Sequence, residues 1–173
     1  MDDLVYRVLV AREASNVRRT HTLPHHGDYT VGKHTHDMMS LLFILHPNPS
    51  ISLIKTIHHH DIAERWFGDM PATVKWFDTE IDNRLSVLEA EHMSNRGWVL
   101  PELTEDEYLW LHALDKLELW LWCHDQMSLG NQGAYSILKN VELWFSSHQS
   151  PAEIPMFMKS YNWYRTEELT KNE

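Results

Sequence analysis

The stretch from Thr104 to Met127 constrains the fold more than any other part of the sequence. It opens with Thr104 and Glu107, a Thr–x–x–Glu pair that is typical of a capping box at the start of a helix. The residues that follow are rich in tryptophan and leucine and are nearly apolar on all sides. A helix of this kind is buried by its neighbours rather than left in water. We therefore expect one central helix that ends near Met127.

The remaining apolar patterns also have the spacing of helices, with no useful period-2 alternation and no internal repeat. The predicted fold class is all-α, and residues 1–173 fit one domain whose charged end, about 165–173, is expected to fray. Pro71 fits the first turn of a short helix. The residues expected to face inward are Leu4, Val5, Val8, Leu9 and Ala11 in the first helix, Met38, Leu41, Leu42 and Leu45 in a helix that Pro47 ends, and Ile81, Leu85, Leu88 and Met93 in a helix of about 78–95 that Gly97 ends.

Composition excludes several classes of protein. Apolar residues make up 43% of the chain and include eight tryptophans, which is enough for a substantial core. The sequence has no run of about 18 apolar residues, so no membrane span is expected. It has no basic segment leading into an apolar one at the N-terminus, so no signal peptide is expected. Cys123 is the single cysteine, which excludes an intramolecular disulfide framework and a thiolate zinc site. We expect a cytoplasmic protein.

The charge of the chain limits its partners. A net charge of −10 with neutral histidines argues against a nucleic-acid polymer, because polymer-binding proteins usually carry a basic stripe. A small anionic substrate remains possible if a metal ion and a few local cations serve it. The chain has 13 histidines, and most of them are expected to be ordinary surface or core residues.

The densest cluster of chemically useful residues is HHHDIAERWFGDMPATVKW, from His58 to Trp76. Its apolar residues have helical spacing up to Gly68, so a helix is expected there. On that helix His60 and Glu64 share a face through their i, i+4 relation, with Asp61 beside them. An imidazole and two carboxylates on a buried face are costly unless something neutralises them. A divalent cation would do so.

Two further residues are candidates for the same metal shell. Asp115 interrupts LWLHALDKLELWLW, where a core helix favours another leucine, and His34 begins its own helix. Taken alone, Asp115 could lie on a solvated seam with Lys116, and His34 could be a polar helix start. With His60 and Asp61 they supply two imidazoles and two carboxylates, a mixed shell suited to Zn, Mn, Co, Fe or Mg with positions left for water and substrate.

The order His34, His60–Asp61, Asp115 on an all-α chain resembles the HD-domain metal-dependent phosphohydrolases. The segment HDIAERWFGDMPATVKW is similar to the HD-x-x-E…GD-x-P…VK segment of the YfbR-like 5′-deoxynucleotidases and of the phage dATP triphosphohydrolases called DatZ. NVRRTHT, shortly before His34, resembles their arginine-bearing substrate segment. The resemblance covers about residues 16–120 and implies a single HD-domain helical bundle.

The resemblance also implies roles for individual residues. Glu64 would donate a proton or orient the attacking water, and Asp69 would face the sugar or the reacting phosphate. Two positions depart from the family: Thr20 follows the arginine where relatives commonly have an aromatic residue, and His112 stands where they often have a lysine. The metal ligands would be His34, His60, Asp61 and Asp115, and the substrate-binding residues Arg18, Arg19, Thr20, Lys75 and His112.

The resulting expectation is a dATP triphosphohydrolase that releases deoxyadenosine and triphosphate by metal-activated attack of water at the α-phosphate. The compact length and the Arg18–Arg19 pair favour this over a 5′-deoxynucleotidase that acts on monophosphates. The family implies a homo-oligomer, extra Mg, Mn or Co on the substrate phosphates, and, in phages that use 2-aminoadenine, depletion of dATP in the host cytoplasm. A peptidase motif HExxH is absent from the sequence, and the chain is too short for a (β/α)₈ barrel. A non-enzymatic metal-binding helical interaction module is the alternative of another class.

Overall fold

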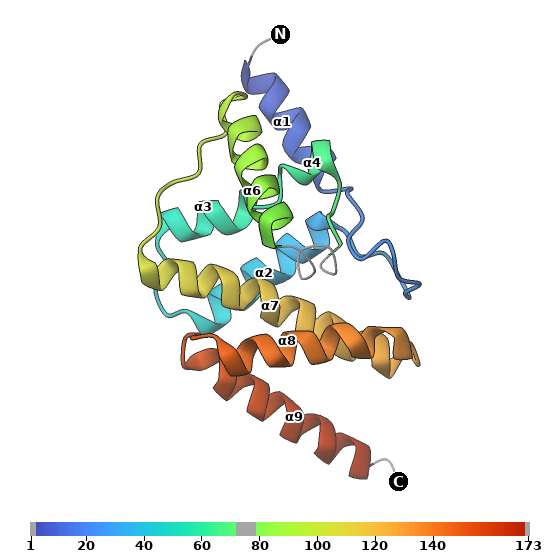
Figure 1. Ribbon diagram of the computed structural model, residues 1–173. Helices are drawn as coiled ribbons and strands as arrows, with labels where there is room; N and C mark the ends of the chain where they lie inside the picture. Colours follow the sequence, from blue (N-terminus) through green and yellow to red (C-terminus); the bar gives the residue numbers. More distant parts are fainter. Residues whose placement is uncertain (1–2, 72–78, 172–173) are drawn as a thin grey trace. The chain divides into compact units, whose positions relative to one another are not determined.

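Figure 1 shows the computed structural model of the chain, in which residues 3–71 and 79–171 are described. The all-α prediction is confirmed, since the β structure within those residues is one isolated antiparallel bridge between Arg18 and Thr30. No helix among them is long and apolar enough to cross a membrane. The short helix expected at Pro71 falls outside the described residues. The helices are α1 (Asp3–Ala14), α2 (Val31–Leu45), α3 (Ile51–His59), α4 (Glu64–Phe67), α6 (Thr79–Ser94), α7 (Glu105–Ser128), the 3₁₀ helix η1 (Gln132–Ala134), α8 (Tyr135–Ser147) and α9 (Glu153–Lys171).

By its internal contacts the chain forms two compact units. The first comprises Met1–Met39 and Ser50–Glu102, and the second comprises Ser40–Pro49 and Leu103–Glu173. Helix α2 begins in the first unit and ends in the second. The expectation of one domain over the whole chain stays a prediction.

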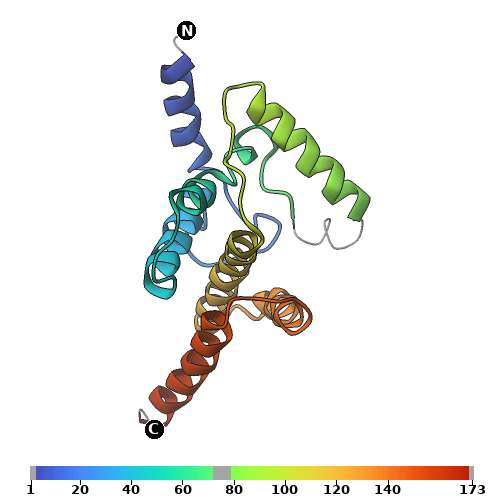
Figure 2. The ribbon, with the colours of Figure 1, turned by 90° about the vertical axis from the view of Figure 1, so that its left-hand side faces the viewer.

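The first unit contains a small apolar cluster formed by α1, the turn before α4, and α6. Val10, Ala14, Ile62, Ala63 and Met93 are each at most 5% exposed. Figures 1 and 2 show α4 beside the last turn of α1, and the two helices are in contact. This packing fixes the start of α4 close to the end of α3, where the HD dipeptide lies. The cluster is extended by the partly buried residues Tyr6, Ala11, Trp66, Trp98 and Leu100.

The predicted inner faces of α1 and α6 are partly wrong. Both helices form close to the expected bounds, but the side of α1 expected to be buried is exposed, and its Val10 and Ala14 are buried instead. The sequence of α1 is apolar on two sides, so periodicity could not choose between them. On α6 only the carboxyl end enters the core, through Met93. The exposed residues are Leu4 (60%), Val5 (49%), Val8 (52%) and Leu9 (47%) of α1, and Ile81 (44%) and Leu88 (53%) of α6.

The predicted continuous helix through the HD dipeptide is also wrong. Helix α3 ends at His59, and the amide of Ile62 donates to the carbonyl of His59, which makes a tight turn. The chain resumes helix only at Glu64, whose amide donates to the carbonyl of Asp61. His60 and Glu64 are therefore not i, i+4 neighbours on one helix. The break frees the backbone to turn Asp61 away from the axis of α3.

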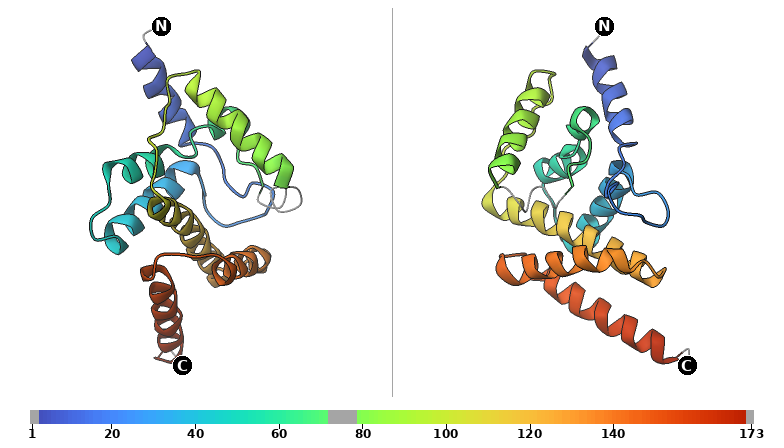
Figure 3. Two further views of the ribbon diagram at one scale, coloured as in Figure 1. Left: turned by 60° about the vertical axis from the view of Figure 1, so that its left-hand side comes forward. Right: turned by 45° about the vertical axis from the view of Figure 1, so that its right-hand side comes forward.

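The second unit is built on α7, as the sequence predicts. Thr104 and Glu107 form the reciprocal capping box, and residues on all sides of the helix are buried, among them Leu114, Leu117 and Trp120. Figures 1 and 3 show α8 alongside α7, with α9 following it. Helix α9 packs on α7 through Tyr161, whose ring lies 5.0 Å from that of Trp120.

Candidate metal centre

Three of the predicted metal ligands lie together in the first unit. One ligand atom each from His34, His60 and Asp61 falls within 4.8 Å of the others. His34 lies in the first turn of α2 and is fully buried, whereas His60 and Asp61 follow the last turn of α3 and are about one-sixth exposed. The shortest distances are 3.2 Å from Asp61 Oδ1 to His60 Nε2 and 3.7 Å from Asp61 Oδ2 to His34 Nε2. Segments 26 positions apart in sequence thus supply one compact group of donors.

The backbone sets the tautomer of His60. Its Nδ1 lies 2.8 Å from the carbonyl oxygen of Ile57. A carbonyl only accepts, so Nδ1 carries the proton and the lone pair of the neutral ring is on Nε2. That Nε2 is buried, and no hydrogen-bond partner for it exists among the residues the structure describes. An imidazole whose N–H is held by a backbone carbonyl, with its other nitrogen left to bind the ion, is a common arrangement of a metal-ligating histidine.

These donors fit a divalent metal ion. Zinc binds imidazole nitrogen at ~2.0–2.1 Å and carboxylate oxygen at ~2.0–2.2 Å, so donors of one ion lie within roughly 3–4.5 Å of each other. The observed spread of the three donors is close to that range. Two nitrogens and a carboxylate oxygen also accept Mn, Co or Fe. A buried Nε2 without a hydrogen bond is the observation that a metal ligand explains.

Arg19 approaches the same group from the segment before α2. Its guanidinium donates to Asp61 Oδ2 at 2.5 Å, and both side chains are at most 16% exposed. Its carbon Cζ also lies 5.6 Å from the ring centroid of Tyr29, which is 1% exposed. A cation held between a buried ring and a carboxylate is fixed in direction. Arg19 therefore presents positive charge at the edge of the His–His–Asp group.

The two predicted catalytic carboxylates lie at the first residue of α4 and just beyond its end. Glu64 is its first residue and is partly buried, but it is not among the donors within 4.8 Å of each other. Asp69 follows Gly68, whose φ of 75° ends the helix, and its Oδ2 accepts from the Thr20 amide at 2.9 Å. The structure thus brings Asp69 to the Arg19–Thr20 segment. The resemblance had placed it against the substrate.

Asp115 and His112 belong to α7 in the second unit. Asp115 is partly buried and accepts from the ammonium of Lys116 at 2.8 Å. His112 is exposed and stacks on Tyr108, with ring centroids 6.3 Å apart. The part that Asp115 takes in a metal shell stays a prediction.

The remaining predicted cations are found elsewhere. Arg18 is exposed and lies 3.7 Å from Asp28 in its own segment. Lys33, a further basic residue in α2, pairs with Asp37 one turn along the helix, at 2.5 Å. Lys75 lies outside the described residues. Among the predicted cations, Arg19 is the one that the structure pairs with Asp61, the aspartate of the His60–Asp61 dipeptide.

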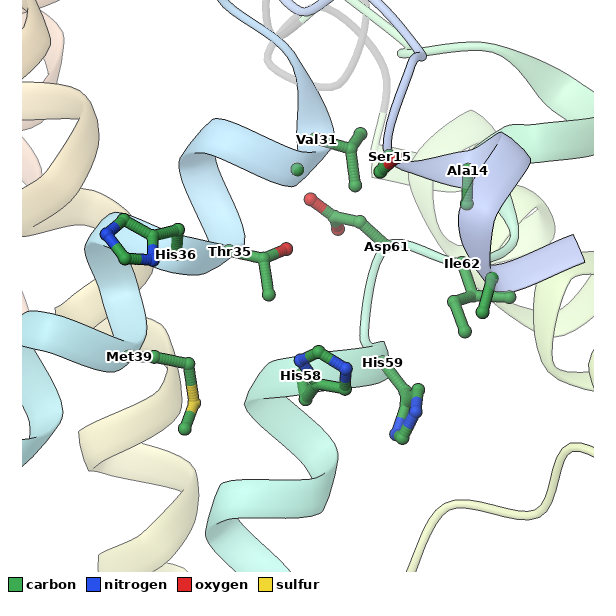
Figure 4. Close-up of a pocket in the computed structure, with 12 residues that line it drawn as sticks. Ala14, Ser15, Val31, Thr35, His36, Met39, His58, His59, Asp61 and Ile62 are labelled. Atoms are coloured by element: carbon green, nitrogen blue, oxygen red, sulfur yellow. The ribbon is translucent and has the colours of Figure 1, made fainter. Parts of the chain in front are cut away.

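A pocket of about 310 Å³ adjoins Asp61 within the first unit. Figure 4 shows the end of α1, the first turns of α2 and the end of α3 around it, with the hydroxyl of Thr35 directed inward. Its volume is at the lower end of the ~300–1,000 Å³ that is usual for small-molecule sites. Its lining residues are Ala11, Ala14, Ser15, Val31, Gly32, Thr35, His36, Met39, His58, His59, Asp61 and Ile62.

Sequence reasoning missed two contributors to the site. Tyr29 packs under Arg19 and meets the ring of His34 edge-on, with centroids 6.3 Å apart. The carbonyl of Ile57 holds the ring of His60. Neither had a signal in the sequence, because one depends on a loop folding back and the other on a main-chain atom.

The chain resembles known proteins in its fold, and its sequence gives no match. No protein-family model matches the sequence, and no curated protein matches it significantly. The fold, however, matches solved structures over nearly the whole chain, and it is the fold seen in an HD phosphohydrolase.

One similar structure is the HD phosphohydrolase DatZ of cyanophage S-2L, solved with dA and one catalytic Zn²⁺ ion. The match has a TM-score of 0.62 at 13% identity and covers 95% of this chain and 96% of that one. Another is the PH0347 protein of Pyrococcus horikoshii, with a TM-score of 0.70 at 15% identity over 90% of this chain and 96% of that one. At such identities the likeness establishes the fold alone. The dA and the Zn²⁺ ion belong to the DatZ structure.

Proposed function

We propose that the chain is a metal-dependent deoxynucleotide phosphohydrolase whose preferred substrate is dATP. The observation that carries this proposal is the buried group of His34, His60 and Asp61 in a chain with the HD phosphohydrolase fold. DatZ, with the same fold, is described with dA and a catalytic Zn²⁺ ion. Water would attack the α-phosphorus and the bond from that phosphorus to O5′ would break, so that deoxyadenosine and triphosphate leave.

The proposed metal shell consists of His34, His60, Asp61 and Asp115. The first three are supported by their mutual distances, and Asp115 by the resemblance. A bound divalent ion lowers the pKa of its water from ~15.7 toward 7 and offsets charge on phosphoryl oxygens. The Ile57 carbonyl keeps His60 in the tautomer that can act as a ligand.

The other residues act on the substrate and on protons. Glu64, one turn after Asp61, is proposed to give a proton to O5′ or to orient the water. Arg19 lies at the edge of the donor group and offsets charge on the phosphate. The resemblance implies that Asp69 faces the sugar or the phosphate. Arg18, Thr20, Lys75 and His112 are proposed to line the substrate site, also by the resemblance.

The test is product analysis. The purified protein is incubated with each of the four deoxynucleoside triphosphates and monophosphates, with Mn or Co added, and the products are separated by chromatography. Deoxyadenosine with triphosphate from dATP supports the proposal. Inorganic phosphate from monophosphates alone supports the 5′-deoxynucleotidase alternative. Tight metal binding without any turnover would leave a non-enzymatic metal-binding module.

A further inference from the structure

Thr20 has a backbone conformation that its side chain disfavours. Its φ of 51° is the only positive value at a non-glycine position among the residues that the structure describes. The left-handed region crowds Cβ against the backbone, and a β-branched residue there is a genuine outlier. Such conformations persist only where the surroundings hold them, and they gather at functional sites. Contacts with neighbouring groups therefore need to stabilise this positive φ, because threonine itself disfavours it.

Two contacts hold this turn: the Leu23 amide donates to the Thr20 carbonyl at 3.0 Å, and Asp69, 49 residues later, binds the Thr20 amide. The Thr20 amide donates to Asp69 Oδ2 at 2.9 Å, and the Asp69 side chain is only 13% exposed. The Thr20 hydroxyl does not help, because it is buried and has no hydrogen-bond partner within the described part of the chain. A hydrogen bond to a partly buried carboxylate is stronger than one to a neutral acceptor. Asp69 is thus the group that holds the amide of the turn.

The direction of the turn decides where Arg19 points. The Arg19 amide donates to the carbonyl of Tyr29 at 2.9 Å, and the next residue reverses the chain. With its backbone held on both sides, Arg19 directs its guanidinium over the Tyr29 ring and onto Asp61. If Thr20 relaxed to an ordinary negative φ, the chain after Arg19 would leave in another direction, and this placement would be lost.

We propose that Asp69 is a positioning residue: through the Thr20 amide it holds the left-handed turn that aims Arg19 at the HD aspartate. This role rests on the proposed function, in which Arg19 serves the substrate phosphate. It differs from a direct role of Asp69 on the substrate, because it acts through the backbone: it needs an acceptor oxygen, and the charge only strengthens the bond.

The first experiment is a double-mutant cycle on kcat/KM. Asp69→Ala is expected to lower kcat/KM for the deoxynucleotide about tenfold, mainly by raising KM, because Arg19 is no longer held. Asp69→Asn keeps an acceptor oxygen and is expected to lose at most a few fold. In a Thr20→Gly background the effect of Asp69→Ala is expected to fall toward none, because glycine adopts a positive φ without being held. Asp37→Ala is the matched control, because this carboxylate of α2 is partly exposed and pairs with Lys33 in its own helix.

The second experiment does not depend on activity. Amide hydrogen exchange followed by NMR is expected to show protection at Thr20 in the parent protein and in Asp69→Asn, and fast exchange in Asp69→Ala. Titration with Mn or Zn is expected to give the same affinity for the parent and for Asp69→Ala, because the ligands are untouched. If Asp69→Ala lost protection at Thr20 but neither the parent nor any variant turned over substrate, the proposed function would be refuted. The role of Asp69 in holding the turn would still be supported.

Other outcomes would overturn the positioning role. If Asp69→Asn were as damaging as Asp69→Ala, and Thr20→Gly did not reduce the effect, the charge of Asp69 would act directly on the substrate. Unchanged protection at Thr20 in Asp69→Ala would show that another group holds the turn.

Discussion

His60 illustrates how a main-chain atom prepares a side chain for chemistry. The Ile57 carbonyl accepts from Nδ1, which leaves Nε2 facing Asp61 at 3.2 Å. Arg19 occupies the other side of that carboxylate, on Oδ2. The two oxygens of Asp61 therefore face different partners, a neutral nitrogen and a cation. A carboxylate placed in this way is the residue on which the metal proposal depends most.

Substituting the two acidic residues of the HD-x-x-E segment separates metal binding from catalysis. Asp61→Ala removes a ligand oxygen and is expected to abolish both metal content and hydrolysis. Glu64→Ala is expected to keep the metal and lose about 10²–10⁴-fold in kcat, the usual contribution of a general acid or base. Metal content by elemental analysis and kcat by product chromatography check both. Asp37→Ala is the control, and turnover retained in Asp61→Ala would refute the assignment.

At the scale of elements, the contact of α9 on α7 includes a titratable group. The imidazole of His124 lies 4.2 Å from the ring of Trp120 and 5.3 Å from that of Tyr161. Burial among these rings lowers the pKa of His124 below its ordinary value of 6.5, and the Arg165 guanidinium of α9 lowers this pKa further. Two carboxylates act in the opposite direction, Glu142 of α8 and Asp125 of α7.

This lowered pKa predicts a pH-dependent stability. The unfolded chain takes up the proton at about pH 6.5, before the folded chain does, so the stability that neutral His124 gives is present above pH 6.5 and is lost as the pH falls below it. We expect the difference in unfolding free energy between the parent and His124→Gln to shrink from pH 8 to pH 5. Urea denaturation at each pH measures it, with His148→Gln, at the exposed residue that caps the end of α8, as the matched control. A difference that grew on acidification would contradict the sign.

For the whole molecule, metal binding and folding are linked. His34, His60 and Asp61 come from distant segments and are brought together only by folding, so an ion that binds them stabilises the native state by mass action. A free metal concentration 100 times Kd adds about 2.7 kcal/mol to the free energy of unfolding.

Thermal unfolding with and without metal tests this linkage. Zn or Mn is expected to raise Tm, a chelator to reverse the rise, and Asp61→Ala to abolish it. Asp115→Asn tests the fourth proposed ligand, and a weaker metal affinity with a smaller rise in Tm is expected. An unchanged affinity in Asp115→Asn would remove α7 from the shell, with Glu105→Gln as the control on the same helix.

Most of the helices and the spacing of the chemical groups could be predicted from the amino-acid sequence. Helical periodicity, the Thr104–Glu107 capping box and the stop at Gly97 are local, because they depend on residues a few positions apart. The order of His34, His60 and Asp61 was also readable, since the HD dipeptide and its surroundings form a local motif. These features predicted an all-α chain with one concentrated site.

The buried faces of the helices and the contacts between distant segments depend on the folded chain. Helix α1 has two apolar sides, and the packing of Ile62 and Met93 selected the side of Val10. The break after His59, the carbonyl on the ring of His60 and the hold of Asp69 on Thr20 depend on backbone atoms, and the last of these joins segments 49 residues apart. The pattern of side chains along the sequence does not predict such main-chain contacts, because these contacts are stabilised by the folded surroundings.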